Sequence, residues 1–373
     1  MKILHASTND LMGGAAMTAN SLVAALNEQG KIKADLIVRD KFTDFQYVKQ
    51  VESGSRFVAK LLSSTVQLGL RFRHMQHFSI PYGVVKLSEL VQRGDYDLLH
   101  LHWIQACFID INDLTKVTSP IVWTLHDLWP LTLWSHVISK PDGSFLHTRI
   151  ERLLKIFKRM NDEKRLTIVS PSRHLAKLAS QMGWSNVKVI RNQFSDISEY
   201  GVSKNLIKFP PARVSNIGMV VAGGAQDRNK GVMDFIELAR SNPDKQFHIL
   251  GADNCLECTN IKSYPFTRDK HAVYAFLSEL DYLFIPSRFE NFPSVAIEAF
   301  QVGTPVVGYK SNLGVAEIVL ESGFGSLIDD QQHFFEAIAH TQNLNNDINF
   351  KILKECYTSY QQHIELYVDI LNG

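Results

Sequence analysis

The sequence has little of three things that would point to particular classes of protein, namely net charge, cysteine and long apolar runs. Its 39 Lys and Arg residues nearly balance 38 Asp and Glu residues, which leaves a formal charge of +1. This balance argues against a nucleic-acid-binding footprint over the whole surface. Four cysteines among 373 residues are typical of a reducing compartment. No apolar stretch approaches the ~20 residues that a membrane-spanning helix requires.

Three motifs are also missing or incomplete. The apolar run at residues 2–6 is too short for a signal peptide, so we expect a cytoplasmic protein. The loop after it contains Gly13-Gly14 but lacks the Gly-x-Gly-x-x-Gly pattern of dinucleotide binding, which weakens an oxidoreductase interpretation. Cys255 and Cys258 have the spacing of half a zinc site or a redox pair. No second pair follows, so we expect two thiols in a loop and no metal.

Segments typical of strands and of helices alternate along the whole chain, which predicts the α/β class with doubly wound parallel sheets. With 45% hydrophobic residues, the chain is long enough for two domains with separate cores. A polar stretch at 203–211 ends in Pro210-Pro211 and predicts a linker. Apolar residues at helical spacing predict one long helix near the C-terminus, over 353–371. The expected divisions are 1–200, 201–350 and a terminal helix at 351–373.

The most informative stretch of the sequence runs from residue 287 to residue 307. The apolar run just before it, at 282–285, predicts a strand, and a tight loop follows. After Pro293 the apolar spacing suits a short buried helix with Ser294 as its N-cap. This stretch therefore predicts a strand, a loop and a helix in close succession.

Two carboxylates flank this predicted loop. Glu290 lies where the strand ends, and Glu298 lies about one turn inside the helix. Carboxylates suit sugar hydroxyls, whereas free amides at a helix start suit a diphosphate, so the stretch predicts a sugar-nucleotide site. Each acid alone has an ordinary alternative, as a solvated loop residue or as an acid favoured by the helix dipole. The amides belong to Asn291, Phe292, Ser294 and Val295.

The same stretch resembles the signature of the retaining family 4 glycosyltransferases of the GT-B fold. The matching residues are Glu290-Asn291-Phe292-Pro293, then Glu298-Ala299-Phe300, then Gly303-Thr304-Pro305-Val306-Val307. The resemblance implies two Rossmann-like domains facing across a cleft, with the last helix crossing back to the first domain. It also implies retaining, metal-independent transfer of a hexose from a UDP- or GDP-linked sugar to an acceptor hydroxyl, with no other cofactor.

The resemblance assigns roles to individual residues. His126 follows the predicted strand at 121–125 and resembles the family's His-Asp motif, in which the His lies under the donor sugar. Lys230 matches the family's Lys-Gly pair, and Arg228 is expected to replace the arginine usual at position 224. The expected catalytic residues are His126, Lys230 and Glu290. The expected donor-binding residues are Gly13, Gly14, Arg228, Lys230, Phe266, Glu290, Asn291, Phe292, Ser294 and Glu298.

Several of these residues have structural alternatives. Gly13-Gly14 could approach a ligand or simply form a tight turn. Phe266 could stack on a nucleobase or fill core. His126 could be a satisfied structural histidine. His100 and His102 share one face of the predicted strand at 98–101 and could ligate a metal with a third donor, or they could be core or cleft-lining histidines.

Two basic amphipathic helices are predicted, over 56–78 and 150–160. Such a helix can lie on an anionic membrane surface, or it can pack its apolar face on a sheet, which we expect for the first of them. The partners implied by the resemblance are a nucleotide sugar and a glycan or lipid-linked acceptor, in polysaccharide or lipopolysaccharide synthesis. The alternatives are a non-catalytic sugar- or nucleotide-binding protein and a nucleotide-sugar epimerase of the same fold.

Overall fold

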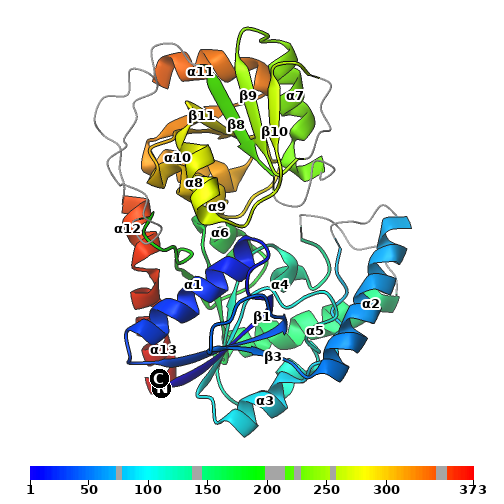
Figure 1. Ribbon diagram of the computed structural model, residues 1–373. Coiled ribbons are helices and arrows are strands. Elements are labelled where there is room, and N and C mark those ends of the chain that lie inside the picture. The colour runs from blue at the N-terminus through cyan, green and yellow to red at the C-terminus, as the bar shows by residue number, and fades with distance from the viewer. Residues whose placement is uncertain (73–77, 137–144, 198–214, 222–227, 253–257, 342–350) are drawn as a thin grey trace. The chain divides into compact units, whose positions relative to one another are not determined.

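The structure is a computed structural model, and it describes residues 1–72, 78–136, 145–197, 215–221, 228–252, 258–341 and 351–373. The chain divides into two compact units (Figure 1). Unit 1 comprises Met1–Phe194 and Thr358–Gly373, and unit 2 comprises Ser195–Tyr357. The predicted linker at 203–211 and Cys255 lie outside the described residues.

Unit 1 is built on a parallel sheet with the strand order β3-β2-β1-β4-β5-β6-β7. Its central strands are buried on both faces, as parallel strands covered by helices require, and they carry polar residues such as His5 and His100 among the apolar ones. The strands are β1 (Lys2–Asn9), β2 (Lys33–Asp40), β3 (Val48–Gln50), β4 (Leu98–Leu101), β5 (Ile121–Thr124), β6 (Leu166–Ser170) and β7 (Val187–Val189). The helices are α1 (Gly14–Glu28), α2 (Ser53–Phe72), α3 (Leu87–Gly94), α4 (Trp129–Thr132), α5 (Phe145–Asp162), α6 (Arg173–Gln181) and α13 (Ser359–Asn372).

Unit 2 repeats this plan with the strand order β10-β9-β8-β11-β12-β13, again parallel throughout. Its core contains four fully buried phenylalanines, Phe235, Phe247, Phe284 and Phe334. The strands are β8 (Asn216–Val220), β9 (Gln246–Leu250), β10 (Ile261–Tyr264), β11 (Tyr282–Ile285), β12 (Val306–Tyr309) and β13 (Gly325–Ile328). The helices are α7 (Val232–Arg240), α8 (Lys270–Ser278), α9 (Ser294–Gln301), α10 (Leu313–Ser322), α11 (Phe334–Thr341) and α12 (Lys351–Tyr357).

Each sheet reverses its strand order at one place. In unit 1 the reversal lies between β1 and β4, and in unit 2 it lies between β8 and β11. In doubly wound sheets ligands bind beyond the carboxyl ends of the strands at this switch point. The predicted α/β class is therefore confirmed, and the loops after these strands are where a site is expected.

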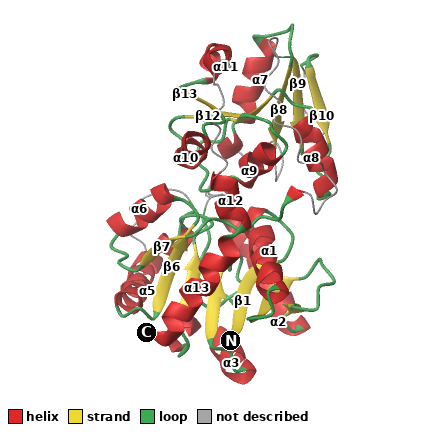
Figure 2. Cartoon of the chain, turned by 90° about the vertical axis from the view of Figure 1, so that its left-hand side faces the viewer, coloured by secondary structure: helices red, strands yellow, loops and turns green. Residues whose placement is uncertain are grey.

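The single C-terminal helix predicted over 353–371 is wrong. The chain breaks at Thr358 into α12 and α13, because the two halves pack in different units. Helix α12 contacts α9 and α10, whereas α13 lies side by side with α1 (Figure 2). Leu366 and Tyr367 of α13 belong to the same core as Leu22 of α1.

Helix α2 does not pack its predicted apolar face on the sheet. Phe57 and Leu61 are 69% and 58% exposed, and Leu62 is exposed too, whereas the helix buries the small side chains of Ala59 and Ser63. Helix α5 behaves as expected of an amphipathic helix and buries Ile150, Leu153, Phe157 and Met160. Among helices in the described part of the chain, none is both long and apolar enough to cross a membrane.

Candidate functional site at the strand switch points

In unit 2 the structure brings Lys230 and Glu290 together. Lys230 ends a short 3₁₀ turn (Arg228–Lys230) that precedes α7, and Glu290 lies in the loop between β11 and α9. Lys230 Nζ lies 2.7 Å from Glu290 Oε1, and both side chains keep partial contact with solvent. These two segments follow β8 and β11, the strands on either side of the order reversal. A cation and a carboxylate therefore share the position where this fold binds ligands.

Asn229 holds the two segments in register. Its amide donates to the Phe289 carbonyl oxygen at 2.9 Å, and its side-chain oxygen accepts from the Phe289 amide at 3.0 Å. Its carbonyl oxygen accepts from the Arg288 amide at 2.7 Å. No local sequence pattern indicates this role of Asn229, because its partners Arg288 and Phe289 lie far along the chain.

Asn312 also supports the loop that carries Glu290. Its side-chain oxygen accepts from the Glu290 amide at 3.2 Å and from the Val315 amide, which it caps at the start of α10. Its side-chain amide donates to the Ser287 carbonyl oxygen at 2.8 Å. Asn229 and Asn312 therefore fix the backbone of the loop that carries Glu290. Of these contacts, only the capping of α10 by Asn312 has a signal in the sequence.

Gly231 is required next to Lys230 for a backbone reason. Its φ of 68° lies in the left-handed region, and a Cβ there would lie 2.2 Å from the Pro286 carbonyl oxygen. The end of β11 therefore approaches the start of α7 closely, which brings Lys230 to the loop that carries Glu290. A side chain at position 231 would push these segments apart.

Glu298 lies inside α9 and is nearly buried. Its carboxylate forms an ion pair with Lys270, the first residue of α8, where Asp269 caps the helix. Lys270 was not selected from the sequence, because its pairing with Glu298 spans two elements that no local pattern connects.

The prediction of Ser294 as N-cap is wrong, since Ser294 is the first helical residue and Pro293 takes the cap position. Proline suits a helix start because its φ is preset and it has no N–H to satisfy.

The remaining predicted donor-binding residues differ in how far they are buried. Asn291 and Phe292 are buried in the loop, whereas Ser294 in the first turn of α9 is partly exposed. Phe266 is 51% exposed, so the core alternative for this ring is wrong. Position 224 and the side chain of Arg228 lie outside the described residues.

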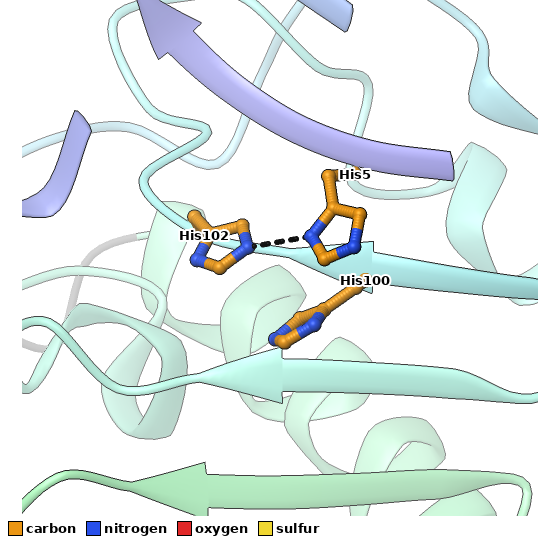
Figure 3. A group of neighbouring side chains, drawn as sticks. All are labelled: His5, His100 and His102. Carbon is orange, nitrogen blue, oxygen red and sulfur yellow. Dashed lines mark hydrogen bonds between the residues drawn. The ribbon is translucent and has the colours of Figure 1, made fainter. Parts of the chain in front are cut away.

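In unit 1 the predicted His126 lies at the end of a chain of hydrogen-bonded histidines. His126 Nε2 is 3.2 Å from His102 Nδ1, and His102 Nε2 is 3.0 Å from His5 Nδ1. Figure 3 shows His5 and His102 joined in this way, with His100 beside them. His100 bonds instead to Tyr367 Oη at 2.6 Å and to Thr124 Oγ1 at 2.7 Å. The rings come from β1, β4 and the loops after β4 and β5.

His5 is the third histidine that a metal site with His100 and His102 would need, with candidate ligand atoms within 4.8 Å of one another. The ring geometry does not fit a metal. His102 stacks on His100, with 4.3 Å between centroids and an interplanar angle of 24°, so the in-plane lone pairs of these two rings do not point at one position. His102 Nε2 is instead directed at His5 Nδ1, and the nitrogens of His100 are bonded to Tyr367 and Thr124. These residues form a buried histidine core.

Asp127 organises the loop beyond His126. Its carboxylate accepts from the Trp129 amide at 2.9 Å at the start of α4, and it lies 2.6 Å from His136 Nδ1. Trp103 Nε1 donates to the same carboxylate at 3.3 Å. The two residues of the His-Asp motif therefore have different roles. His126 contacts the histidine chain, and Asp127 fixes the loop.

Gly13 lies at the start of α1 with φ 86° and ψ 163°, a conformation that is essentially restricted to glycine. A Cβ at this position would meet no atom within 4 Å. The residue is therefore needed for its backbone conformation, as the tight-turn alternative predicts. Both Gly13 and Gly14 are exposed, which leaves their backbone accessible to a ligand.

Two family profiles match the chain one after the other. The profile described as "Glycosyltransferase Family 4" matches residues 12–193. The profile described as "Glycosyl transferases group 1" matches residues 203–347. The chain belongs to the group 1, family 4 glycosyltransferases. The resemblance seen in the sequence is thereby confirmed.

This family 4 chain is 22% identical over 267 residues to "Putative colanic acid biosynthesis glycosyl transferase WcaC" of Escherichia coli strain K12. The alignment covers 63% of this chain and 64% of the relative, so the chain spans slightly less than two thirds of that relative's length.

Solved structures match the family 4 chain over its whole length. Sucrose-phosphate synthase from Thermosynechococcus elongatus has a TM-score of 0.68 at 14% identity, covering 100% of this chain and 99% of the other. The lipopolysaccharide outer core galactosyltransferase WaaB has a TM-score of 0.62 at 15% identity, covering 99% of each chain. Anabaena HepE in complex with UDP-glucose has a TM-score of 0.56 at 16% identity, covering 100% and 98%. These likenesses confirm the predicted GT-B fold.

The buried histidines of this family 4 chain are neutral at pH 7. Burial lowers the pKa of His5 to about 3 and that of His363 to about 4. Burial also lowers the pKa of His100 and of His102 well below the ordinary value, with the neighbouring histidines adding to the effect. The pKa of His126 falls to about 4 through burial, against a smaller opposing effect of the Asp127 carboxylate.

We predict that unit 1 loses stability as the pH falls from 7 to 5. Unfolded histidines take up protons below about pH 6.5, whereas the folded histidines do so only near pH 3 to 4, so protons favour the unfolded chain in this window. Each fully buried histidine then costs about 2 kcal/mol of stability between pH 7 and pH 5. The thermal unfolding midpoint should fall by about 10 °C or more.

The matched controls are single substitutions. His100→Gln removes one buried histidine and should flatten the pH dependence, whereas the exposed His271→Gln should leave it unchanged. An unfolding midpoint that does not move between pH 7 and pH 5 contradicts the neutral histidine core.

Proposed function

We propose that the protein transfers a sugar from a nucleoside diphosphate sugar to an acceptor hydroxyl with retention of anomeric configuration. The observation that carries this proposal is the Lys230–Glu290 pair at the β8/β11 switch point. A diphosphate needs a cation and a sugar needs a hydrogen-bond acceptor, and the segments after β8 and β11 offer one of each. Membership of the glycosyltransferase family supports the reaction class.

The reaction demands stabilisation of the negative charge that develops on the departing diphosphate. Lys230 supplies a positive charge, and the first-turn amides of α9 supply partial positive charge, so no divalent metal is required in this proposal. Glu290 accepts from hydroxyls of the donor sugar. Glu298 accepts from the ribose hydroxyls, with the ion pair to Lys270 holding its carboxylate in place. The donor phosphate itself takes the acceptor proton.

The donor is a UDP- or GDP-linked hexose. Anabaena HepE, which shares this fold, has been solved with UDP-glucose, and this supports a nucleotide sugar as donor. The exposed Phe266 offers a face on which a nucleobase can stack. His126 donates to a sugar hydroxyl beside the anomeric carbon, and Gly13 and Gly14 leave their backbone open to the donor phosphates or the acceptor.

The acceptor is a glycan or a lipid-linked glycan in polysaccharide or lipopolysaccharide synthesis. The names of WcaC and WaaB support this class of acceptor. Helix α2 supports contact with an anionic membrane surface, because it exposes Phe57, Leu61 and Leu62. The cations beside them are Arg56, which donates to Gln50, and Lys60, which forms an ion pair with Asp40. Apolar side chains next to cations are typical of helices that lie on such a surface. We therefore propose a cytoplasmic protein with peripheral membrane contact.

Release of nucleoside diphosphate from a panel of UDP- and GDP-linked sugars, without acceptor, tests the proposed activity. We expect slow hydrolysis of one donor, which transfer to an acceptor glycan accelerates. Binding without any release contradicts the proposal and indicates a sugar-nucleotide-binding protein. Interconversion of two nucleotide sugars without release contradicts it too and indicates an epimerase.

We predict that Lys230→Met and Glu298→Gln each lower kcat/KM for transfer by about 100-fold or more, because each removes a charge from the donor site. Lys230→Met should change the unfolding midpoint little, because its ion pair is partly exposed. Glu298→Gln leaves Lys270 unpaired and should lower the midpoint, so kcat/KM is measured well below it. Lys262→Met on β10 is the matched control, since Lys262 is exposed and outside the proposed site. Wild-type kcat/KM in both site variants contradicts the assigned roles.

A second prediction concerns α2. The double variant Phe57→Ser with Leu61→Ser should bind vesicles of phosphatidylglycerol and phosphatidylcholine at least about tenfold more weakly than the wild type, because two apolar contacts are lost. Co-sedimentation measures the binding. Leu320→Ser on α10 is the control, since Leu320 is 73% exposed on another surface. Equal binding of the double variant, or α2-dependent self-association without vesicles, contradicts the membrane contact.

A further inference from the structure

Three histidine rings form a linear hydrogen-bonded chain in unit 1. His126 contacts His102 through Nε2 and Nδ1 at 3.2 Å, and His102 contacts His5 through Nε2 and Nδ1 at 3.0 Å. The second of these contacts is drawn in Figure 3. Each nitrogen pair holds one proton, which one ring donates and the other accepts.

The three rings are coupled because each neutral imidazole carries only one N–H. Burial lowers the pKa of all three, so all are neutral at pH 7. Two arrangements satisfy both contacts. Either every ring carries its proton on Nε2, or every ring carries it on Nδ1. The proton position in His5 therefore determines the proton position in His126.

The environment of His5 distinguishes the two arrangements. His5 Nε2 is buried and has no hydrogen-bond partner among the described residues. A proton on this atom would be a buried N–H without an acceptor, which is rare in folded proteins. The remaining arrangement gives His5 a protonated Nδ1 that donates to His102 Nε2. His102 then donates from Nδ1 to His126 Nε2.

We propose that His102 is a positioning residue that fixes the tautomer of His126, so that His126 presents a protonated Nδ1 to the ligand. Within the described part of the chain, His126 Nδ1 has no hydrogen-bond partner, and the residue is partly exposed. A ligand oxygen can accept from this N–H. The proposal deepens the proposed function, on which it rests for the identity of the ligand as a sugar hydroxyl.

The orientation of His102 is fixed by its neighbours. Its ring stacks on that of His100, with a centroid distance of 4.3 Å, and meets that of His5 edge to edge through the Nε2–Nδ1 hydrogen bond. His100 is in turn held by Tyr367 of α13 and Thr124 of β5. His100 makes no hydrogen bond to the three-ring chain among the contacts that the described residues form, so it provides a control within the same core.

Nitrogen-15 NMR of histidine-labelled protein without ligand tests the proposal. The His126 signals are assigned by their loss in His126→Asn. In the wild type we expect His126 to carry its proton on Nδ1. In His102→Ala we expect a shift toward the Nε2 tautomer and a fall in kcat/KM of at least tenfold. His102→Asn should restore the Nδ1 tautomer, because its amide nitrogen takes the place of His102 Nδ1 and can donate to His126 Nε2.

The control His100→Gln should lower the unfolding midpoint and leave the His126 tautomer unchanged, which separates positioning from stability. A wild-type His126 protonated on Nε2 overturns the proposal. An unchanged tautomer in His102→Ala overturns it as well. Because the tautomer is measured without substrate, a protonated Nδ1 in a protein without transferase activity supports the tautomer assignment and contradicts only the proposed function.

Discussion

The reversal of strand order in the middle of each parallel sheet is the constraint on which the rest of the structure depends. It separates the loops after two neighbouring strands and leaves room for a ligand beyond their carboxyl ends. In unit 2 these loops carry Lys230 and Glu290. In unit 1 His5 and His100 lie within the two strands at the reversal, and His102 and His126 follow β4 and β5. The chemistry of each unit is therefore fixed by which residues follow these strands.

The two units use different electrostatics. Unit 2 holds opposite charges in pairs, and Lys230–Glu290 keeps contact with water, so such a pair stabilises the fold by about 1 kcal/mol or less. An anionic ligand can replace the carboxylate at Lys230 without a large cost to the fold. Glu298 is nearly buried with Lys270, which makes this pair the more rigid of the two. Unit 1 offers neutral rings whose order comes from hydrogen bonds and stacking.

Structural features that depend on a local sequence pattern could be predicted well. Continuous apolar runs located the central strands, and the Glu290 to Glu298 motif located a strand, loop and helix. The sequence could not reveal contacts between distant segments, such as Asn229 with Phe289 or Lys270 with Glu298, which form only when the sheet brings their loops together. The exposed apolar face of α2 was mispredicted for a related reason, because periodicity shows that a face is apolar but not what covers it.

Amide hydrogen exchange, measured with and without saturating UDP or GDP, tests whether the β8/β11 switch point of unit 2 binds the diphosphate of the donor, as we propose. We expect slower exchange at residues 228–231 and 290–298 with the nucleotide that binds. Nucleotide binding detected by calorimetry, with unchanged exchange in both segments, would show that the diphosphate binds elsewhere.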